Sequence, residues 1–165
     1  MNDIKQLISD LQLQKHPEGG WFSRVYSAPY SLQNIDRAIS GSIYFLLGKR
    51  EVSHFHQIDC DEIWYYHKGC GLKIYLIYSD GQLHQEILGI NIAKGEKPMV
   101  IIPKGAIFAA ENIIIDDFTL ISCVTTPQFT FEGFKLFTQA ELLKKYPEHC
   151  HIIKKMAFEK ISNQS

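Results

Sequence analysis

Hydrophobic and polar residues follow two different rhythms along this chain of 165 residues. Near the N-terminus, apolar residues recur at the spacing of one helical face, which predicts a short amphipathic helix over residues 2–13. After the segment HPEGG at 16–20, the pattern changes to short runs rich in β-branched and aromatic residues, each typical of a strand. These runs are WFSRVY (21–26), ISGSIYFLL (39–47), DEIWYY (61–66), LKIYLIY (72–78), LHQEILGI (83–90), MVIIP (99–103), FTLISCV (118–124) and FTFEGFKLF (129–137).

Turn and capping signals separate these runs. Asp80-Gly81 between two of them predicts a β-hairpin. Thr138 and Glu141 form a capping-box pattern, so TQAELLKKY should be a helix that stops before Pro147. Residues 151–165 fit either a weak helix or a loose tail. Many short strands with helices only at the ends predict an antiparallel sandwich or barrel, without deciding which.

Composition and charge narrow the class of protein. The chain is 45% hydrophobic and 21% charged with a net charge of −1, as expected for one globular domain over 1–165 with no nucleic acid partner. No apolar stretch approaches the roughly 18 residues of a membrane span. The four cysteines show no close pairing and no export signal precedes them, so we expect reduced thiols in a cytoplasmic protein. A Cys60–Cys70 link across a hairpin is the nearest alternative.

The segment SHFHQIDCDEIWYYHKG at 53–69 carries the clearest chemical signal. His54 and His56 are two residues apart on a presumed strand and share a face. On the next strand Glu62, Trp64 and Tyr66 share a face, and a turn at 58–60 would set Glu62 beside the histidines. Two imidazoles and one carboxylate can bind a metal ion or act without metal as a base and its orienting carboxylate. Histidines on strands also often serve only as hydrogen-bonding partners.

The HPEGG segment and the strand after it raise a second possibility. Pro17 should end the first helix, and the glycines allow a tight turn. In WFSRVY, one face carries Trp21, Ser23 and Val25, and the other carries Phe22, Arg24 and Tyr26. Arg24 could bind a carboxylate or phosphate, or it could form an ion pair with Glu18. We favour the structural role for Glu18 and Arg24.

These motifs resemble the cupin superfamily. Gly48, five residues, His54-x-His56, then Glu62, six residues and Gly69 is similar to the first cupin motif, although five residues separate His56 from Glu62 where three or four are usual. The segments HPEGGWFSRVYS (16–27), SIYFLL (42–47), ILG (87–89), PKG (103–105) and TPQFTFEGFKLFTQAELLKKYPEH (126–149) resemble the cupin 5 group, or domain of unknown function 985, in which Gly usually replaces Gln128. The resemblance covers about residues 11–149, leaving 150–165 as a tail. It implies an all-β, double-stranded β-helix (jelly-roll) barrel with short terminal helices.

The resemblance also exposes a missing ligand. Cupins usually take their last metal-binding histidine from a position after the PKG turn, and here that position is Phe108. Three ligands, His54, His56 and Glu62, could still bind a single divalent metal, and His84 is a weak substitute for the fourth. The alternative is no cofactor, with Trp64 and Phe108 forming an aromatic slot for a ligand or simply filling the barrel.

Three functions stay open. The leading hypothesis is a metal-free isomerase, epimerase or lyase acting on a polar metabolite such as a sugar derivative, by analogy with metal-free sugar-epimerase cupins. Its catalytic residues would be His56 as base, Glu62 and Tyr66, with substrate bound by His16, Arg24, Tyr44, Trp64 and Phe108. The alternatives are a metal-dependent dioxygenase or isomerase, and a ligand-binding or sensing barrel without turnover. The resemblance also implies a homodimer.

Overall fold

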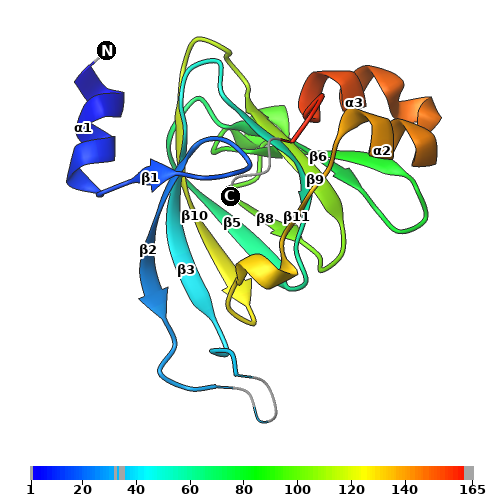
Figure 1. The fold of residues 1–165 in the computed structure, drawn as a ribbon. Coiled ribbons are helices and arrows are strands. Elements are labelled where there is room, and N and C mark those ends of the chain that lie inside the picture. Colours follow the sequence, from blue (N-terminus) through cyan, green and yellow to red (C-terminus); the bar gives the residue numbers. More distant parts are fainter. Residues whose placement is uncertain (1, 32, 34–35, 162–165) are drawn as a thin grey trace.

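The computed structural model describes residues 2–31, 33 and 36–161, in which two antiparallel sheets pack face to face (Figure 1). The first sheet has the strand order β1 (Gln14–Lys15), β2 (Trp21–Ser27), β3 (Gly41–Leu47), β10 (Thr119–Thr126), β5 (Asp61–Gly69) and β8 (Met99–Ile102). The second has the order β11 (Lys135–Leu136), β4 (Val52–Gln57), β9 (Ile107–Asn112), β6 (Leu72–Ile77) and β7 (Leu83–Leu88). This is a jelly roll with short terminal helices, so the fold class expected from the sequence is confirmed.

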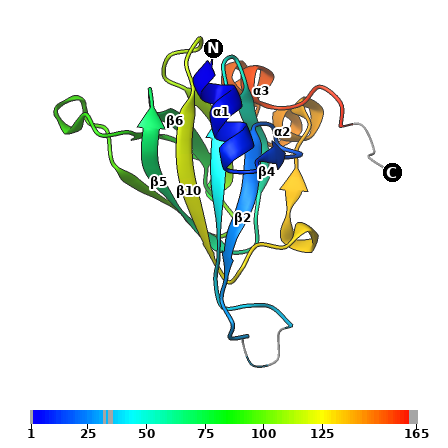
Figure 2. The same cartoon turned by 90° about the vertical axis from the view of Figure 1, so that its left-hand side faces the viewer.

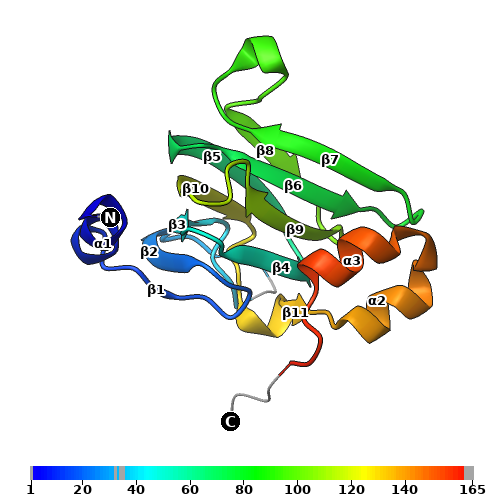
Figure 3. The same ribbon diagram turned by 90° about the horizontal axis from the view of Figure 1, so that it is seen from above.

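The helices cover the outer sides of the sheets. α1 (Asn2–Asp10) lies against the outside of the first sheet (Figure 2), where its apolar side chains pack on Leu46, Phe118 and Leu120. α2 (Gln139–Lys145) and α3 (Cys150–Met156) lie beside the second sheet (Figure 3). Three single-turn 3₁₀ helices, Ile92–Lys94, Phe131–Gly133 and Pro147–His149, lie in the connections.

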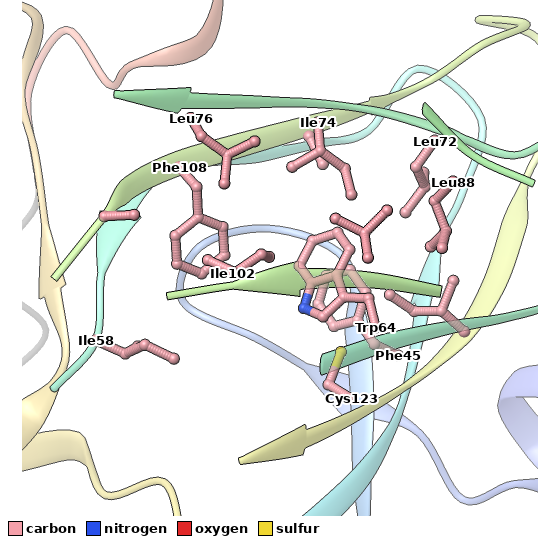
Figure 4. Close-up of a cluster of buried hydrophobic side chains, with 14 of the residues drawn as sticks. Phe45, Ile58, Trp64, Leu72, Ile74, Leu76, Leu88, Ile102, Phe108 and Cys123 are labelled. Carbon is pink, nitrogen blue, oxygen red and sulfur yellow. The ribbon is translucent and has the colours of Figure 1, made fainter. Parts of the chain in front are cut away.

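The main core fills the space between the two sheets. Trp64 lies at its centre, with Phe45 and Cys123 on the same sheet and Phe108 on the facing one (Figure 4). These side chains point inward because they occupy alternate positions of their strands. The core also holds Ile58, Leu72, Ile74, Leu76, Leu88, Ile102 and Ile121.

Several local predictions are confirmed. The Asp80-Gly81 turn joins β6 to β7, with Gly81 N–H donating to the carbonyl of Tyr78 at 2.9 Å. The Thr138 capping box begins α2, and its hydroxyl accepts the Glu141 N–H. All four cysteines are free thiols. No helix within 2–31, 33 and 36–161 has the length and apolar character needed to cross a membrane.

Other local predictions are wrong. The run FTFEGFKLF at 129–137 forms only the 3₁₀ turn and the two-residue strand β11, and at Gly133 the chain passes close to the Asp59 carboxylate. β9 was not predicted, since IFAAEN carries alanine and polar residues of low β-propensity. The first helix ends at Asp10 and not at residue 13, because Gln12 adopts a left-handed conformation. The open question about the C-terminus is partly answered by α3, while residues 162–165 lie outside the described residues.

Candidate functional site

A cavity of about 50 Å³ opens between the two sheets, room for a few water molecules. Its walls come from β2, β3, β5 and β10, from the HPEGG segment, and from the segment that follows β10. The lining residues are His16, Glu18, Phe22, Arg24, Tyr26, Gly41, Ser42, Ile43, Phe45, His56, Ile58, Glu62, Trp64, Cys123, Thr125, Gln128, Phe129 and Phe131.

The HPEGG segment is a tight loop that links the two sheets. Gly19 and Gly20 have positive φ angles of 111° and 73°, and the His16 N–H donates to the Gly20 carbonyl at 3.1 Å. The loop leaves the edge of the first sheet and reaches β4 of the second, where the His54 N–H donates to the Glu18 carbonyl at 2.8 Å. A Cβ atom at Gly19 would lie 2.0 Å from the Val52 carbonyl oxygen, so this close approach requires glycine.

The loop places the Glu18 carboxylate between two histidines. Its Oε2 atom lies 3.2 Å from His16 Nδ1 and 3.1 Å from His56 Nε2, and its Oε1 atom accepts a 2.8 Å hydrogen bond from the Ser53 hydroxyl. Glu18 is only 6% exposed. Burial alone would raise its pKa, but His56, His16 and the hydrogen bonds lower the pKa to about 2. Glu18 is therefore a buried anion.

His56 has protein partners at both ring nitrogens. Nδ1 lies 2.7 Å from the carbonyl oxygen of His54, and Nε2 faces Glu18. The ring centroid is 4.0 Å from that of Phe108, which pairs with His56 across β4 and β9. Burial lowers the pKa of His56 and outweighs the attraction of Glu18. No ring nitrogen of His56 is left over for a ligand.

His16 differs from His56, because only its Nδ1 atom has a polar protein partner. Desolvation lowers the pKa of His16, but the charge of Glu18 and its hydrogen bond raise it above the ordinary value overall. Phenylalanine rings surround the imidazole, with Phe22 at 4.8 Å, Phe134 at 5.6 Å and Phe131 at 6.0 Å between centroids. Nε2 has no hydrogen-bonding partner within the described chain, and it is not among the fully enclosed unpaired atoms. This nitrogen therefore opens on the cavity.

Glu62 lies on β5 across the cavity. It is 8% exposed, and neither oxygen has an ion-pair or hydrogen-bonding partner with normal geometry among residues 2–31, 33 and 36–161. Burial and the negative charge of Glu18 raise its pKa to about 7. The Trp64 indole N–H and the Cys123 thiol lie near enough to oppose this shift, although neither makes a hydrogen bond of normal geometry with Glu62. Glu62 is thus a carboxyl group that titrates near neutral pH at the cavity wall.

Comparison with known proteins places this site in a family. The family model described as cupin superfamily (DUF985) matches residues 5–137. The chain belongs to the cupin superfamily. The uncharacterized protein YML079W of Saccharomyces cerevisiae is 30% identical over 161 residues, which cover 87% of this cupin and 79% of the yeast protein.

Solved structures agree with this assignment. Protein SO0799 of Shewanella oneidensis superposes with a TM-score of 0.92 at 39% identity, over 97% of this cupin and 100% of that chain. A hypothetical protein from Leishmania major gives a TM-score of 0.87 at 32% identity, over 94% and 98%. A variant of oxalate decarboxylase from Bacillus subtilis gives 0.59 at 14% identity, over 93% of this cupin and 40% of that chain. The last similarity is one of fold alone.

The cavity gathers five of the residues singled out in the sequence: His16, Arg24, His56, Glu62 and Trp64. The other four lie elsewhere. The Tyr66 hydroxyl donates to the Gly69 carbonyl at 2.6 Å, and the Tyr44 ring faces His67. Phe108 points inward but packs behind His56 in the core, and the His54 ring stacks on Phe158 with 3.7 Å between centroids.

The metal-binding hypothesis can be tested against this geometry. His54 stacks on Phe158 and does not join His56 and Glu62 at the cavity. Within the part of the chain that the structure describes, no three His, Cys, Asp or Glu side chains are arranged to hold a metal ion. The oxygen that approaches His16 and His56 belongs to Glu18, and it takes the position between their two rings. The residues present do not fit a bound metal.

Sequence reasoning missed the partner of His56. Glu62 was expected to orient this histidine, but Glu62 makes no ion pair with it, and Glu18 lies there instead. The ion pair between Glu18 and Arg24, which was the favoured interpretation, does not form, and Glu18 pairs instead with His16 and His56. A signal for Glu18 existed in the two glycines that follow it, since consecutive glycines indicate a close approach of the backbone to another element.

Proposed function

We propose that this cupin is a metal-free acid–base enzyme of the isomerase, epimerase or lyase kind, which moves a proton at a carbon beside a carbonyl group of a small metabolite. One observation carries the proposal. Glu62 and His16 both line one cavity, in which burial and the charge of Glu18 raise the pKa of Glu62 to about 7 and the charge and hydrogen bond of Glu18 raise the pKa of His16 above its ordinary value.

The two groups have complementary roles. Glu62, with a pKa of about 7, is substantially ionised at neutral pH and removes a proton from carbon. Glu18 raises the pKa of His16 and so favours its imidazolium form, which donates to the carbonyl oxygen as negative charge develops there. No ion pair of up to 4.0 Å joins Glu62 to His16, although both line the cavity. The surrounding phenylalanine rings exclude water and strengthen both effects.

His56 has a positioning role in this scheme. The sequence made it the candidate base, but both of its ring nitrogens are occupied by His54 and Glu18. A base must have a lone pair within reach of the substrate proton. His56 instead helps to hold Glu18, which in turn holds His16.

Exchange of substrate hydrogen with solvent tests the proposal. A panel of keto acids, hydroxy acids and sugar phosphates is incubated with protein in D₂O, and the loss of C–H signals beside the carbonyl is followed by proton NMR. We expect faster exchange than in buffer for at least one compound, and a loss of at least about a hundredfold in Glu62→Gln and in His16→Gln. Glu86→Gln and His84→Gln change the same residue types outside the cavity and should exchange at the wild-type rate.

A ligand-binding barrel without turnover is the competing function. It predicts that a compound of the panel raises the melting temperature with increasing concentration, by mass action, while its C–H signals stay unchanged. That combination of results would replace the enzyme proposal by the binding one.

A further inference from the structure

Most polar groups that line the cavity already have protein partners. The Thr125 hydroxyl accepts the Phe129 N–H at 2.8 Å, and the Gln128 side-chain oxygen accepts the Ser27 hydroxyl at 2.5 Å. Glu18 is occupied by two histidines and Ser53, and His56 by its two partners. The charged side chains that still face the cavity without such partners are few, and they define what a ligand must offer.

Arg24 is one of these open groups. The chain has three arginines, of which Arg37 pairs with Asp59 and Arg50 with Asp116. Arg24 lines the cavity mouth and has no carboxylate partner among residues 2–31, 33 and 36–161. A guanidinium without a partner at the mouth of a cavity is suited to a carboxylate or phosphate.

Arg24 lies on the same sheet as Glu62, three strands away along the cavity wall. It pairs with Ile43 on β3, Ile43 with Cys123 on β10, and Cys123 with Trp64 on β5. Three strand spacings of about 4.8 Å therefore separate β2 from β5, which carries Glu62. A ligand whose anionic group meets Arg24 extends toward Glu62 across the cavity.

The rest of the cavity wall is largely apolar and aromatic. Phe22, Ile43, Phe45, Ile58, Trp64, Phe129 and Phe131 line it. Phe129 and Phe131 lie edge to face at 5.1 Å beside His16. A sugar carries hydroxyl groups along its whole length, and the apolar side chains offer these groups no hydrogen-bonding partner, which leaves only Tyr26, Ser42 and the Trp64 indole N–H as uncharged groups without a protein partner in the described part of the chain. A flat, apolar body is accommodated instead.

We infer that the substrate is an α-keto acid with a flat, aromatic side chain, held by its carboxylate at Arg24 and by its body against the aromatic wall, with its enolisable C–H group at Glu62. This inference rests on the proposed proton-transfer function and names its substrate class. The reaction is keto–enol tautomerisation, or its reversal on the other face of the carbon.

The step balances within the site. The Glu62 carboxylate takes the proton from the carbon next to the carbonyl, and the C–H electron pair forms the carbon–carbon double bond. The carbonyl π electrons move to oxygen, which takes a proton from the His16 imidazolium. After the enol leaves, Glu62 gives its proton to water and His16 takes one from water, which restores both side chains. The step needs no oxidant, reductant or second substrate.

Three probes test the substrate class. Phenylpyruvate has the carboxylate, the carbonyl and the aromatic body, pyruvate lacks the body, and fructose 6-phosphate is an anionic polyol. The exchange of their carbon-bound hydrogens in D₂O is measured against buffer, and phenylpyruvate tautomerisation is followed by the ultraviolet absorbance of its enol. We expect kcat/KM for phenylpyruvate to exceed that for pyruvate by at least about tenfold, because burial of an aromatic ring contributes that much.

The Arg24→Gln variant tests the orientation. Loss of a charge-assisted pair should raise KM for phenylpyruvate roughly tenfold to a hundredfold, with kcat little changed. Arg50→Gln removes a charge far from the cavity and should leave KM unchanged. Absence of phenylpyruvate turnover, or turnover in Arg24→Gln with the wild-type KM, overturns the substrate assignment. Exchange of fructose 6-phosphate alone would overturn it and leave the acid–base function standing, whereas undiminished exchange in Glu62→Gln would overturn that function itself.

Discussion

Oε2 of Glu18 lies 3.1 Å from Nε2 of His56, and this contact joins a loop at the edge of one sheet to the central part of the other. The same loop accepts the His54 N–H at its Glu18 carbonyl. A buried carboxylate is stable only when charges and hydrogen bonds replace the water it has lost. Glu18 therefore has a double effect: it fixes the loop across the two sheets, and it sets the protonation of His16.

Replacing Glu18 should change both properties. In Glu18→Gln, His16 loses the anion that raises its pKa, so that pKa should fall, which an NMR titration of the histidine ring protons detects. Removing one partner of a buried ionic group also costs about 3–5 kcal/mol of unfolding free energy, measurable by denaturant titration. Glu86→Gln breaks a half-exposed pair with Lys97 and should cost less than about 1 kcal/mol. An unchanged His16 titration in Glu18→Gln would contradict the assignment.

The same contact predicts the acid limit of stability. Folding lowers the pKa of Glu18 from 4.5 to about 2, so the folded protein favours the ionised form. This contributes roughly 3 kcal/mol that is fully present above pH 4.5 and is lost as the pH falls from 4.5 to 2. Unfolding curves of wild type and Glu18→Gln should therefore converge over that interval. Parallel curves would show that another group controls acid unfolding.

Metal content is the most direct test of whether the cavity binds a metal ion. Because the Glu18 oxygen lies between His16 and His56, we expect well below one equivalent of any divalent metal in untagged protein purified without added metal or chelator. Elemental mass spectrometry gives this value, and the trace present should be the same in His56→Ala. Close to one equivalent of iron, nickel, zinc or manganese, lost in His56→Ala, would restore the metal-dependent hypothesis.

The sheet positions of the site could be predicted from the sequence. Alternation along WFSRVY put Phe22, Arg24 and Tyr26 on one face, and all three line the cavity. The same rule put Glu62 and Trp64 together. Such predictions succeed because the period of a strand is fixed by backbone geometry and needs no knowledge of what the strand packs against.

The loop contacts could not be predicted in this way. The partner of Glu18 is decided by how closely the HPEGG loop approaches β4, a tertiary relationship that leaves no periodic trace in the sequence. The run FTFEGFKLF was misleading for a related reason. Phe129 and Phe131 alternate like strand residues, yet both line the cavity and, with Phe134, surround His16. Apolar periodicity reports burial, and here burial occurs outside a sheet.

Helix α3 is part of the folded core. Ile153 is fully buried in α3 and packs in a cluster with Phe55 and Leu142. Ile153→Ala should therefore reduce the unfolding free energy by about 2–5 kcal/mol, as expected for a cavity left in a packed core. Lys154→Ala changes the exposed neighbour on the same helix and should cost less than about 0.5 kcal/mol. Equal stability of the two variants in a denaturant titration would show that α3 is only loosely attached.

Ionisation of Glu62 should reduce the stability of the fold near neutral pH, where the proposed function requires the carboxylate form. Folding raises the pKa of Glu62 from 4.5 to about 7, so the folded protein favours the protonated form. Stability therefore falls as the pH rises from 4.5 to 7 and stays reduced above 7, by about 3 kcal/mol. Glutamine has the shape of protonated Glu62 and carries no charge. Glu62→Gln should thus match the wild type near pH 4.5 and exceed it by several degrees of melting temperature at pH 8. A variant that is less stable than the wild type at pH 8 would mean that the Glu62 carboxylate has a partner in the folded protein, and its role as a free base would have to be abandoned.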